Sequence, residues 1–141
     1  MGIPTLISTN TITSDTATSE FTSNLDSTYD EYMFVIYDFR PMTNGGDHFA
    51  FQCSTDGGSN YNTTVTTSYF DARHDEAGNN AALSYQTGYD LAQATTYQPL
   101  AGSVDNAADM GASGILHLFN PSNTTYVKHF YSRFSVGSDY P

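Results

Sequence analysis

The sequence predicts an all-β protein, an antiparallel β-sandwich of the jelly-roll type. Two features of composition indicate this: only 13% of the 141 residues are charged, while aromatic residues make up 14%. Average soluble domains carry about 25% charged residues. Here Ser, Thr, Asn and Tyr supply the polarity, and β-branched and aromatic residues suit pleated, half-buried strands. The third feature is the regular return of turn signals between short apolar segments, which is typical of a sandwich.

The chain has the size of one domain and a strong negative charge. Four Lys and Arg against 15 Asp and Glu give a formal charge of −11. We therefore expect no nucleic-acid and no membrane partner, because contacts with phosphate groups need clustered Lys and Arg. Carbohydrate, a divalent cation or another protein stay open as partners. Neither an export signal nor a membrane span is expected.

The first part of the chain predicts an arm followed by a pair of strands. Residues 1–23 are rich in Ser and Thr and are expected to form an edge strand or an arm, and residues 24–30 a turn. Residues 32–39 are apolar on both faces, which is typical of a central strand covered on both sides. A turn over residues 41–46 leads to residues 48–54, which alternate and are expected to be the return strand. Cys53 falls in that alternation, so we expect a small core residue.

The middle of the chain predicts a hairpin and then weaker elements. Residues 54–60 (Ser-Thr-Asp-Gly-Gly-Ser-Asn) carry the strongest hairpin signal, and residues 61–70 follow as a strand of β-branched and aromatic residues. Residues 71–80 are polar and acidic with a Gly, so a loop or a single short helical turn is expected there. Residues 81–89 predict one short strand, and residues 91–100 an irregular excursion.

The last part of the chain predicts a loop and two strands. Residues 101–114 are rich in Gly, Ala and Asp, and we expect a surface loop. Residues 115–119 are a compact apolar strand, residues 120–123 a tight turn and residues 124–134 the last strand. The expected organisation is therefore an arm (1–23), a sandwich domain (24–135) with strands 32–39 and 124–134 in its core sheet, and a tail (136–141).

Two clusters of polar and charged residues are candidate metal sites. They are Arg73, His74, Asp75 and Glu76, and then Asp105, Asn106 and Asp109. Adjacent residues in an extended loop point in different directions, and no second His or Cys stands at a zinc-ligand spacing. The second cluster lacks the Gly and the closing Glu of the twelve-residue calcium loop. We therefore predict no metal site and no cofactor.

The sequence also indicates no catalytic residues. A glycosidase needs two carboxylates at a set separation, and nothing selects one pair among the 15 acids. No Gly-x-Ser-x-Gly nucleophile elbow occurs. Asp56, Gly57 and Gly58 are explained by a turn, and the glycosylation-type motifs at Asn62 and Asn123 by sheet and turn chemistry. Exposed tyrosines among Ser, Thr and Asn would suit sugar stacking or a polar protein interface.

Several stretches together resemble a family of virion structural proteins from marine tailed bacteriophages, those that infect picocyanobacteria and abundant ocean heterotrophs. The stretches are Asp-Ser-Thr-Tyr-Asp-Glu-Tyr at 26–32, Ser-Thr-Asp-Gly-Gly-Ser-Asn-Tyr-Asn-Thr-Thr at 54–64, His-Asp-Glu at 74–76, Asp-Leu-Ala-Gln at 90–93, Gln-Pro-Leu at 98–100, Gly-Ile-Leu-His-Leu-Phe-Asn-Pro at 114–121 and Thr-Thr-Tyr-Val-Lys-His-Phe at 124–130. The resemblance covers about residues 20 to 134. Members of the family usually continue with further strands, which implies either a truncated variant or a fragment ending at Pro141.

The resemblance implies a non-enzymatic virion protein that decorates the capsid exterior or forms part of a head or tail fibre. It also implies a homotrimer or another symmetric oligomer, made in the host cytoplasm and released by lysis. A low-charge surface of hydroxyls and amides fits this, because seawater screens ion pairs within a few Å. The alternative is a host-receptor adhesin that binds a surface glycan through its tyrosines.

Overall fold

The protein, described here from a computed structural model covering residues 3–43 and 47–138, is built from antiparallel strands. Within those ranges there are seven strands and no helix: β1 (Glu31–Phe39), β2 (Asp47–Phe51), β3 (Phe70–His74), β4 (Ala81–Tyr85), β5 (Gln98–Val104), β6 (Gly111–Phe119) and β7 (His129–Gly137). The all-β, antiparallel, sandwich-like fold that the sequence predicted is confirmed. The jelly-roll topology stays a prediction.

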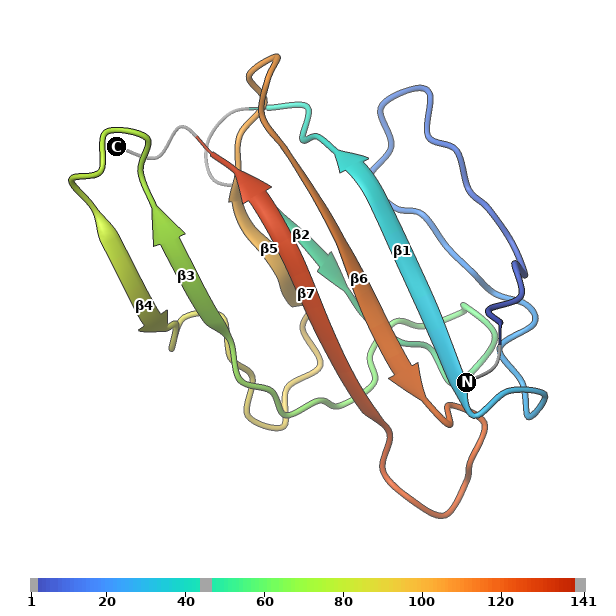
Figure 1. Ribbon diagram of the computed structural model, residues 1–141. Helices are drawn as coiled ribbons and strands as arrows, with labels where there is room; N and C mark the ends of the chain where they lie inside the picture. Colours follow the sequence, from blue (N-terminus) through green and yellow to red (C-terminus); the bar gives the residue numbers. More distant parts are fainter. Residues whose placement is uncertain (1–2, 44–46, 139–141) are drawn as a thin grey trace.

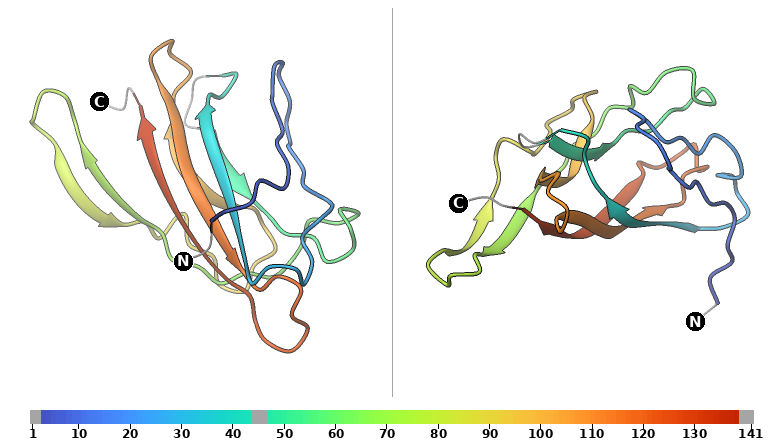
Figure 2. Two further views of the ribbon diagram at one scale, coloured as in Figure 1. Left: turned by 45° about the vertical axis from the view of Figure 1, so that its right-hand side comes forward. Right: turned by 90° about the horizontal axis from the view of Figure 1, so that it is seen from above.

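The strands form three sheets (Figure 1). β1, β6 and β7 make a three-stranded sheet with β6 in the middle, β2 pairs with β5, and β3 pairs with β4. Viewed from above, the β2–β5 pair forms a second layer against the three-stranded sheet (Figure 2). The β3–β4 hairpin projects from the side of the sandwich beyond β7, and the N-terminal arm lies beside β1 at the opposite side.

The three-stranded sheet has one buried and one exposed face, as alternation of side chains requires. Tyr32, Leu116 and Leu118 are buried on the inner face, and Tyr32 stands directly opposite Leu118 in the β1–β6 register. The next residue along β1, Met33, is exposed on the outer face opposite His117. A register shift between Ile36 and Phe39 marks a bulge near the end of β1.

The centre of the core lies between the two layers. Ala101 and Val104 of β5 are fully buried, and Ala112 of β6 almost so. Three aromatic rings pack against this cluster from β1, β2 and β7: they belong to Phe39, Phe49 and Phe134. The ring centroids of Phe39 and Phe49 are 4.7 Å apart, and those of Phe49 and Phe134 are 5.9 Å apart. Small residues in the middle therefore let large rings from three strands converge.

The expectation of a surface loop over residues 101–114 is wrong. β5 continues to Val104, β6 begins at Gly111, and only the turn between them is irregular. The Gly and Ala residues that indicated a loop serve close packing instead. A Cβ atom at Gly114 would lie 2.5 Å from the Arg133 carbonyl oxygen and against the Phe134 ring.

The expected partners of the first two strands are also wrong. Residues 32–39 were predicted to form a central strand covered on both sides, but β1 is an edge strand of its sheet. Residues 48–54 were predicted to return alongside it, but β2 ends at Phe51 and pairs with β5. Both strands pair with segments far along the chain, which local turn chemistry does not reveal. Residues 44–46 of the predicted turn lie outside the described residues.

The predicted hairpin after β2 forms its turn but not its second strand. Gly57 and Gly58 have φ values of 73° and 90°, which glycine adopts without the strain that a Cβ atom brings. Residues 61–69 then run without a ladder, except for a bridge between Val65 and Ala94. Isolated backbone bonds and threonine hydroxyls hold this segment instead. The Thr67 amide donates to the Leu91 carbonyl, and the Leu91 amide donates to Thr67 Oγ1, both at 2.9 Å.

Other boundaries shift by a few residues. The predicted loop 71–80 begins inside β3, which runs to His74, and the strand predicted over 81–89 is β4, which ends at Tyr85. The turn over 120–123 is confirmed, with the Asn123 amide donating to the Asn120 carbonyl at 3.2 Å. The last strand begins at His129 rather than Thr124 and extends to Gly137, into the predicted tail.

Candidate interaction surface

The ionisable residues weighed as metal ligands do not come together. Within residues 3–43 and 47–138, no group of three or more His, Cys, Asp and Glu side chains could hold a metal ion. Asp75 instead closes the β3–β4 turn: its carboxylate accepts from the Asn79 amide and from Asn80 Nδ2, both at 2.8 Å. Hydrogen bonds from Asn80 and Asn79 keep the pKa of this carboxyl below its ordinary value. The Asp75 carboxylate therefore caps the β3–β4 turn.

The second acidic cluster also has a structural role. Asp105 Oδ1 accepts from the Ala107 amide at 3.1 Å. The carbonyl oxygens of Asn106 and Ala107 accept from the guanidinium of Arg40 at 3.2 and 2.9 Å. These bonds tie the β5–β6 turn to the end of β1, and they engage the Asp105 carboxylate and the carbonyls of Asn106 and Ala107.

The carboxyl of Asp56 has a strongly lowered pKa. Its carboxylate accepts from Asn60 Nδ2 at 2.6 Å, from the Asn60 amide at 2.8 Å and from the Ser54 hydroxyl at 2.7 Å. These bonds favour the ionised form and lower the pKa to about 2. Asp56 therefore holds a solvent-exposed turn together.

The other residues that the sequence singled out as possible functional sites lie apart from one another. Cys53 is partly buried just beyond the end of β2, and burial raises the pKa of its thiol. Asn123 Oδ1 accepts from the Thr125 and Tyr126 amides at 2.7 and 2.9 Å, which caps the turn after β6. Asn62 lies on the exposed loop after the Asp56 turn. None of these residues joins another in a site.

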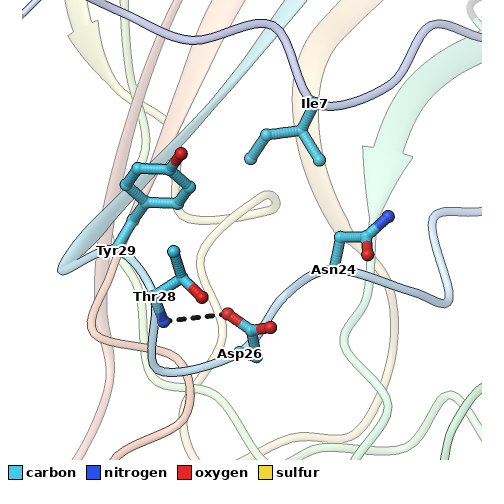
Figure 3. Close-up of a pocket in the computed structure, with 5 residues that line it drawn as sticks. All are labelled: Ile7, Asn24, Asp26, Thr28 and Tyr29. Carbon is cyan, nitrogen blue, oxygen red and sulfur yellow. Dashed lines mark hydrogen bonds between the residues drawn. The ribbon is translucent and has the colours of Figure 1, made fainter.

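Two shallow pockets occur in the described part of the chain. The first, of about 270 Å³, lies between the arm and the turn before β1 and is lined by Ile7, Asn24, Asp26, Thr28 and Tyr29 (Figure 3). Asp26 Oδ1 accepts from the Thr28 amide at 2.8 Å. Hydrogen bonds from the Thr28 side chain and amide, and from the Tyr32 hydroxyl, lower the pKa of Asp26 below its ordinary value. The carboxylate is thus committed to the turn.

The second pocket, of about 320 Å³, lies where the loop before β3 passes β5 and β7. Its walls carry hydroxyl, amide and aromatic groups: Thr66, Thr67, Ser68, Tyr69, Gln98, Pro99, Lys128, His129, Phe130, Tyr131 and Ser132. Gln98 is buried at its base, donating to the Tyr89 and Pro99 carbonyls and bonded to the Thr67 hydroxyl. The side-chain amide of Gln98 therefore has its hydrogen-bond partners within the chain.

Large apolar side chains are exposed in three regions of the surface. The first is the arm with the turn that follows it. All residues from 3 to 30 except Leu25 are exposed there, including Ile3, Leu6 and Ile12. The second half of the arm meets the sandwich at Phe21, whose ring packs edge-on against Phe34 with centroids 5.7 Å apart. The arm is folded back by Asn10 Nδ2, which donates to the Glu20 carbonyl at 3.0 Å.

The second region is the outer face of the three-stranded sheet, where Met33, Val35 and Tyr37 of β1 are exposed. Beside them the rings of His117 and Tyr131 stack in parallel, with centroids 4.6 Å apart and planes at 6°. Phe119 extends this stack, and Glu31 Oε1 lies 2.5 Å from His117 Nδ1. The contact is an ion pair when the imidazole is protonated and a hydrogen bond otherwise.

The third region is the β3–β4 hairpin. Phe70, Leu83 and Tyr85 are exposed on one of its faces, and β3 and β4 hydrogen-bond with no other strand. Sequence reasoning missed the outer sheet face and the hairpin, because it assigned the apolar residues of residues 32–39 to a covered strand and residues 71–80 to a loop. An apolar residue on a strand has the same sequence signature whether its own chain or a partner covers it.

Comparison of the chain with protein-family models, with curated proteins and with solved structures gives no match. No helix in the described ranges has the length and hydropathy that crossing a bilayer takes.

Proposed function

We propose that the protein is a non-enzymatic structural subunit of a tailed-bacteriophage virion, placed on the capsid exterior or in a head or tail fibre. The observation that carries the proposal is the exposed apolar area on the arm, the outer sheet face and the β3–β4 hairpin. Monomeric soluble proteins rarely expose apolar patches of this kind, and such patches mark interaction sites. From the sequence resemblance to virion proteins, we infer that these interactions occur within a phage particle.

The distribution of polar groups supports a structural role over catalysis. The perturbed carboxyls of Asp26, Asp56 and Asp75 each cap a turn through amide donors. Catalytic carboxylates are arranged differently, with one pKa raised beside a cleft. The turns that these residues stabilise need neither ion pairs nor disulfides, which suits a subunit that is made in the host cytoplasm, released by lysis and exposed to seawater.

A host-surface glycan is the second candidate partner, and the stack of His117 and Tyr131 favours it. Tyr131 is about half exposed and borders the second pocket, so an aromatic face stands beside hydroxyl and amide groups. Sugars bind in such surroundings through stacking and hydrogen bonds. On this alternative the subunit stands at a fibre tip and contacts the receptor.

The test is mass spectrometry of gradient-purified particles of a phage that encodes this chain. The proposal predicts peptides of the chain at a fixed copy number relative to the major capsid protein, retained after high-salt washing. Peptides confined to the lysate, with none in washed particles, would refute a structural role in the virion. Binding of the purified chain to a host polysaccharide, with retention only at fibre tips, would favour the adhesin.

A further inference from the structure

We propose that β4 is a dimerisation edge, at which the β3–β4 hairpin of one chain pairs with the same hairpin of a second copy. This inference rests on the proposed function, because it names one contact through which the subunit assembles. It starts from the isolation of the hairpin. β3 and β4 form a two-stranded sheet of their own, and the hairpin projects from the side of the sandwich (Figures 1 and 2).

A hairpin that pairs with no other strand has few contacts that stabilise it. Two strands alone are marginally stable in water, whereas three or more strands with an apolar face are stable. One face of the hairpin carries Phe70, Leu83 and Tyr85, with exposed fractions of 65%, 80% and 48%. The Phe70 and Tyr85 rings pair across the strands at 5.1 Å, which leaves Leu83 without a covering side chain. A second hairpin would complete a four-stranded sheet.

The backbone of β4 is ready to accept a strand. Hydrogen bonds close the hairpin at both ends, from the Asp75 amide to the Asn80 carbonyl at 3.0 Å and from the Gln86 amide to the Tyr69 carbonyl at 2.9 Å. Antiparallel pairs alternate between hydrogen-bonded and non-hydrogen-bonded. In the observed register, Ala81, Leu83 and Tyr85 therefore direct their N–H and C=O groups away from β3, towards the free edge.

The same three residues make the edge self-complementary. When two β4 strands run antiparallel about Leu83, Leu83 faces Leu83 of the second copy and Ala81 faces Tyr85. Both kinds of pair are then hydrogen-bonded, because all three residues direct their backbone groups outward. Side chains directly opposite each other in a sheet share one face. Leu83, Tyr85 and Phe70 of the two copies therefore form one continuous apolar face, as a twofold contact requires.

Charge favours this edge and this orientation. The chain carries a charge of −11, so two copies repel, yet β4 (Ala-Ala-Leu-Ser-Tyr) is uncharged. Free edges are usually protected by Lys, Pro or a bulge, and β4 has none of these. Antiparallel pairing puts the acidic turns at Asp75 and Glu76 at opposite ends of the sheet. Across the four strands, it also aligns Asp71 of one copy with Arg73 of the other. No two like charges are therefore aligned across the sheet.

The test uses the full chain and two opposite substitutions at one position. Leu83→Lys and Leu83→Glu each place like charges face to face at the twofold axis, where they destabilise the pair. Because Leu83 is 80% exposed, neither variant alters the core of the monomer, and thermal unfolding by circular dichroism checks this. Leu6→Lys and Leu6→Glu are matched controls, since Leu6 on the arm is 82% exposed and the net charges are the same.

Sedimentation equilibrium at low salt is the measurement. The wild-type chain and both Leu6 controls are expected to reach twice the chain mass of 15.4 kDa. Each Leu83 variant alone is expected to dimerise at least about tenfold more weakly, and an equimolar mixture of the two should regain a dimer, because Lys then faces Glu. The contact is twofold, so it favours a dimer over the trimer that the sequence resemblance implies.

Three results would overturn the inference: a wild-type monomer, a wild-type trimer, or a mixture of the two Leu83 variants that stays monomeric. The last result would indicate that β4 contacts a different element or a different protein. None of these results bears on whether the chain is present in the virion. A chain found in purified particles but monomeric in solution would refute the β4 contact and leave the proposed function standing.

Discussion

Replacement of Val104 by Ala tests whether the centre of the core lies where β5 meets β6. Val104 is fully buried among Ala101, Ala112 and the rings of Phe39, Phe49 and Phe134. The change removes two methyl groups, worth about 0.8 kcal/mol each in transfer free energy. The cavity left behind adds to this, because a rigid cluster of rings collapses only in part, so the total is about 2–3 kcal/mol. At roughly 3–5 °C per kcal/mol for a chain of this size, Tm should fall by about 6–15 °C.

Val127 offers the matched control, because it is 78% exposed in the loop before β7. Val127→Ala removes the same two methyl groups from a site in water, so its free energy of unfolding should change by less than about 0.5 kcal/mol. Both variants are compared with wild type by urea unfolding at one protein concentration, followed by far-ultraviolet circular dichroism. Equal stabilities of the two variants would refute the core assignment and restore the loop that composition predicts for residues 101–114.

Two further predictions concern a close approach and a turn. Gly114→Ala should destabilise the fold by about 1–3 kcal/mol in the same unfolding assay, because the new Cβ atom meets the Arg133 carbonyl oxygen, which cannot move freely. Gly88→Ala is the control, since the space at its Cβ position is open. Equal stabilities of the two variants would count against the close packing at Gly114. The carboxyl of Asp56 should titrate by NMR with a pKa of about 2, and Asn60→Ala should raise that pKa towards its ordinary value. Because the pKa is lowered in the folded state, this stabilisation is present above the unfolded pKa and is lost as pH falls through about 2. A value near 4 in the wild-type protein would contradict the turn described here.

The sequence predicts the fold class and several strands because composition and alternation are local signals. β1 and β4 appear within the segments predicted for them, and the tight turn after β6 is confirmed. The strand pairings could not be predicted in this way. β1 pairs with β6 and β2 with β5 across long stretches of chain, and turn residues specify only pairings between neighbours.

Two errors show how one residue type serves opposite purposes. Gly and Ala indicate a loop by composition, yet Ala101 and Ala112 are buried in the core, and Gly114 lies closely against β7 of its own sheet. Threonines indicate a strand over residues 61–70, yet the hydroxyls of Thr63 and Thr67 bond backbone groups of other segments. Such side-chain bonds compete with a ladder wherever tertiary neighbours are within reach.

The candidate surface was the least predictable part. The outer-face residues Met33, Val35 and Tyr37 have the apolar pattern of a covered strand, and the structure leaves them exposed. An apolar pattern on a strand does not reveal whether its own chain covers that face.

Cryo-electron microscopy of the intact virion, with this chain traced into the map, tests the proposed role most directly. We expect density for the two-layered sandwich at repeated positions on the capsid lattice or along a fibre, with the apolar surfaces covered by neighbouring chains. Density at the fibre tips alone, with the Tyr131 stack facing outward, would favour the glycan-binding alternative. A complete map in which every chain is assigned and this one is absent would contradict the account.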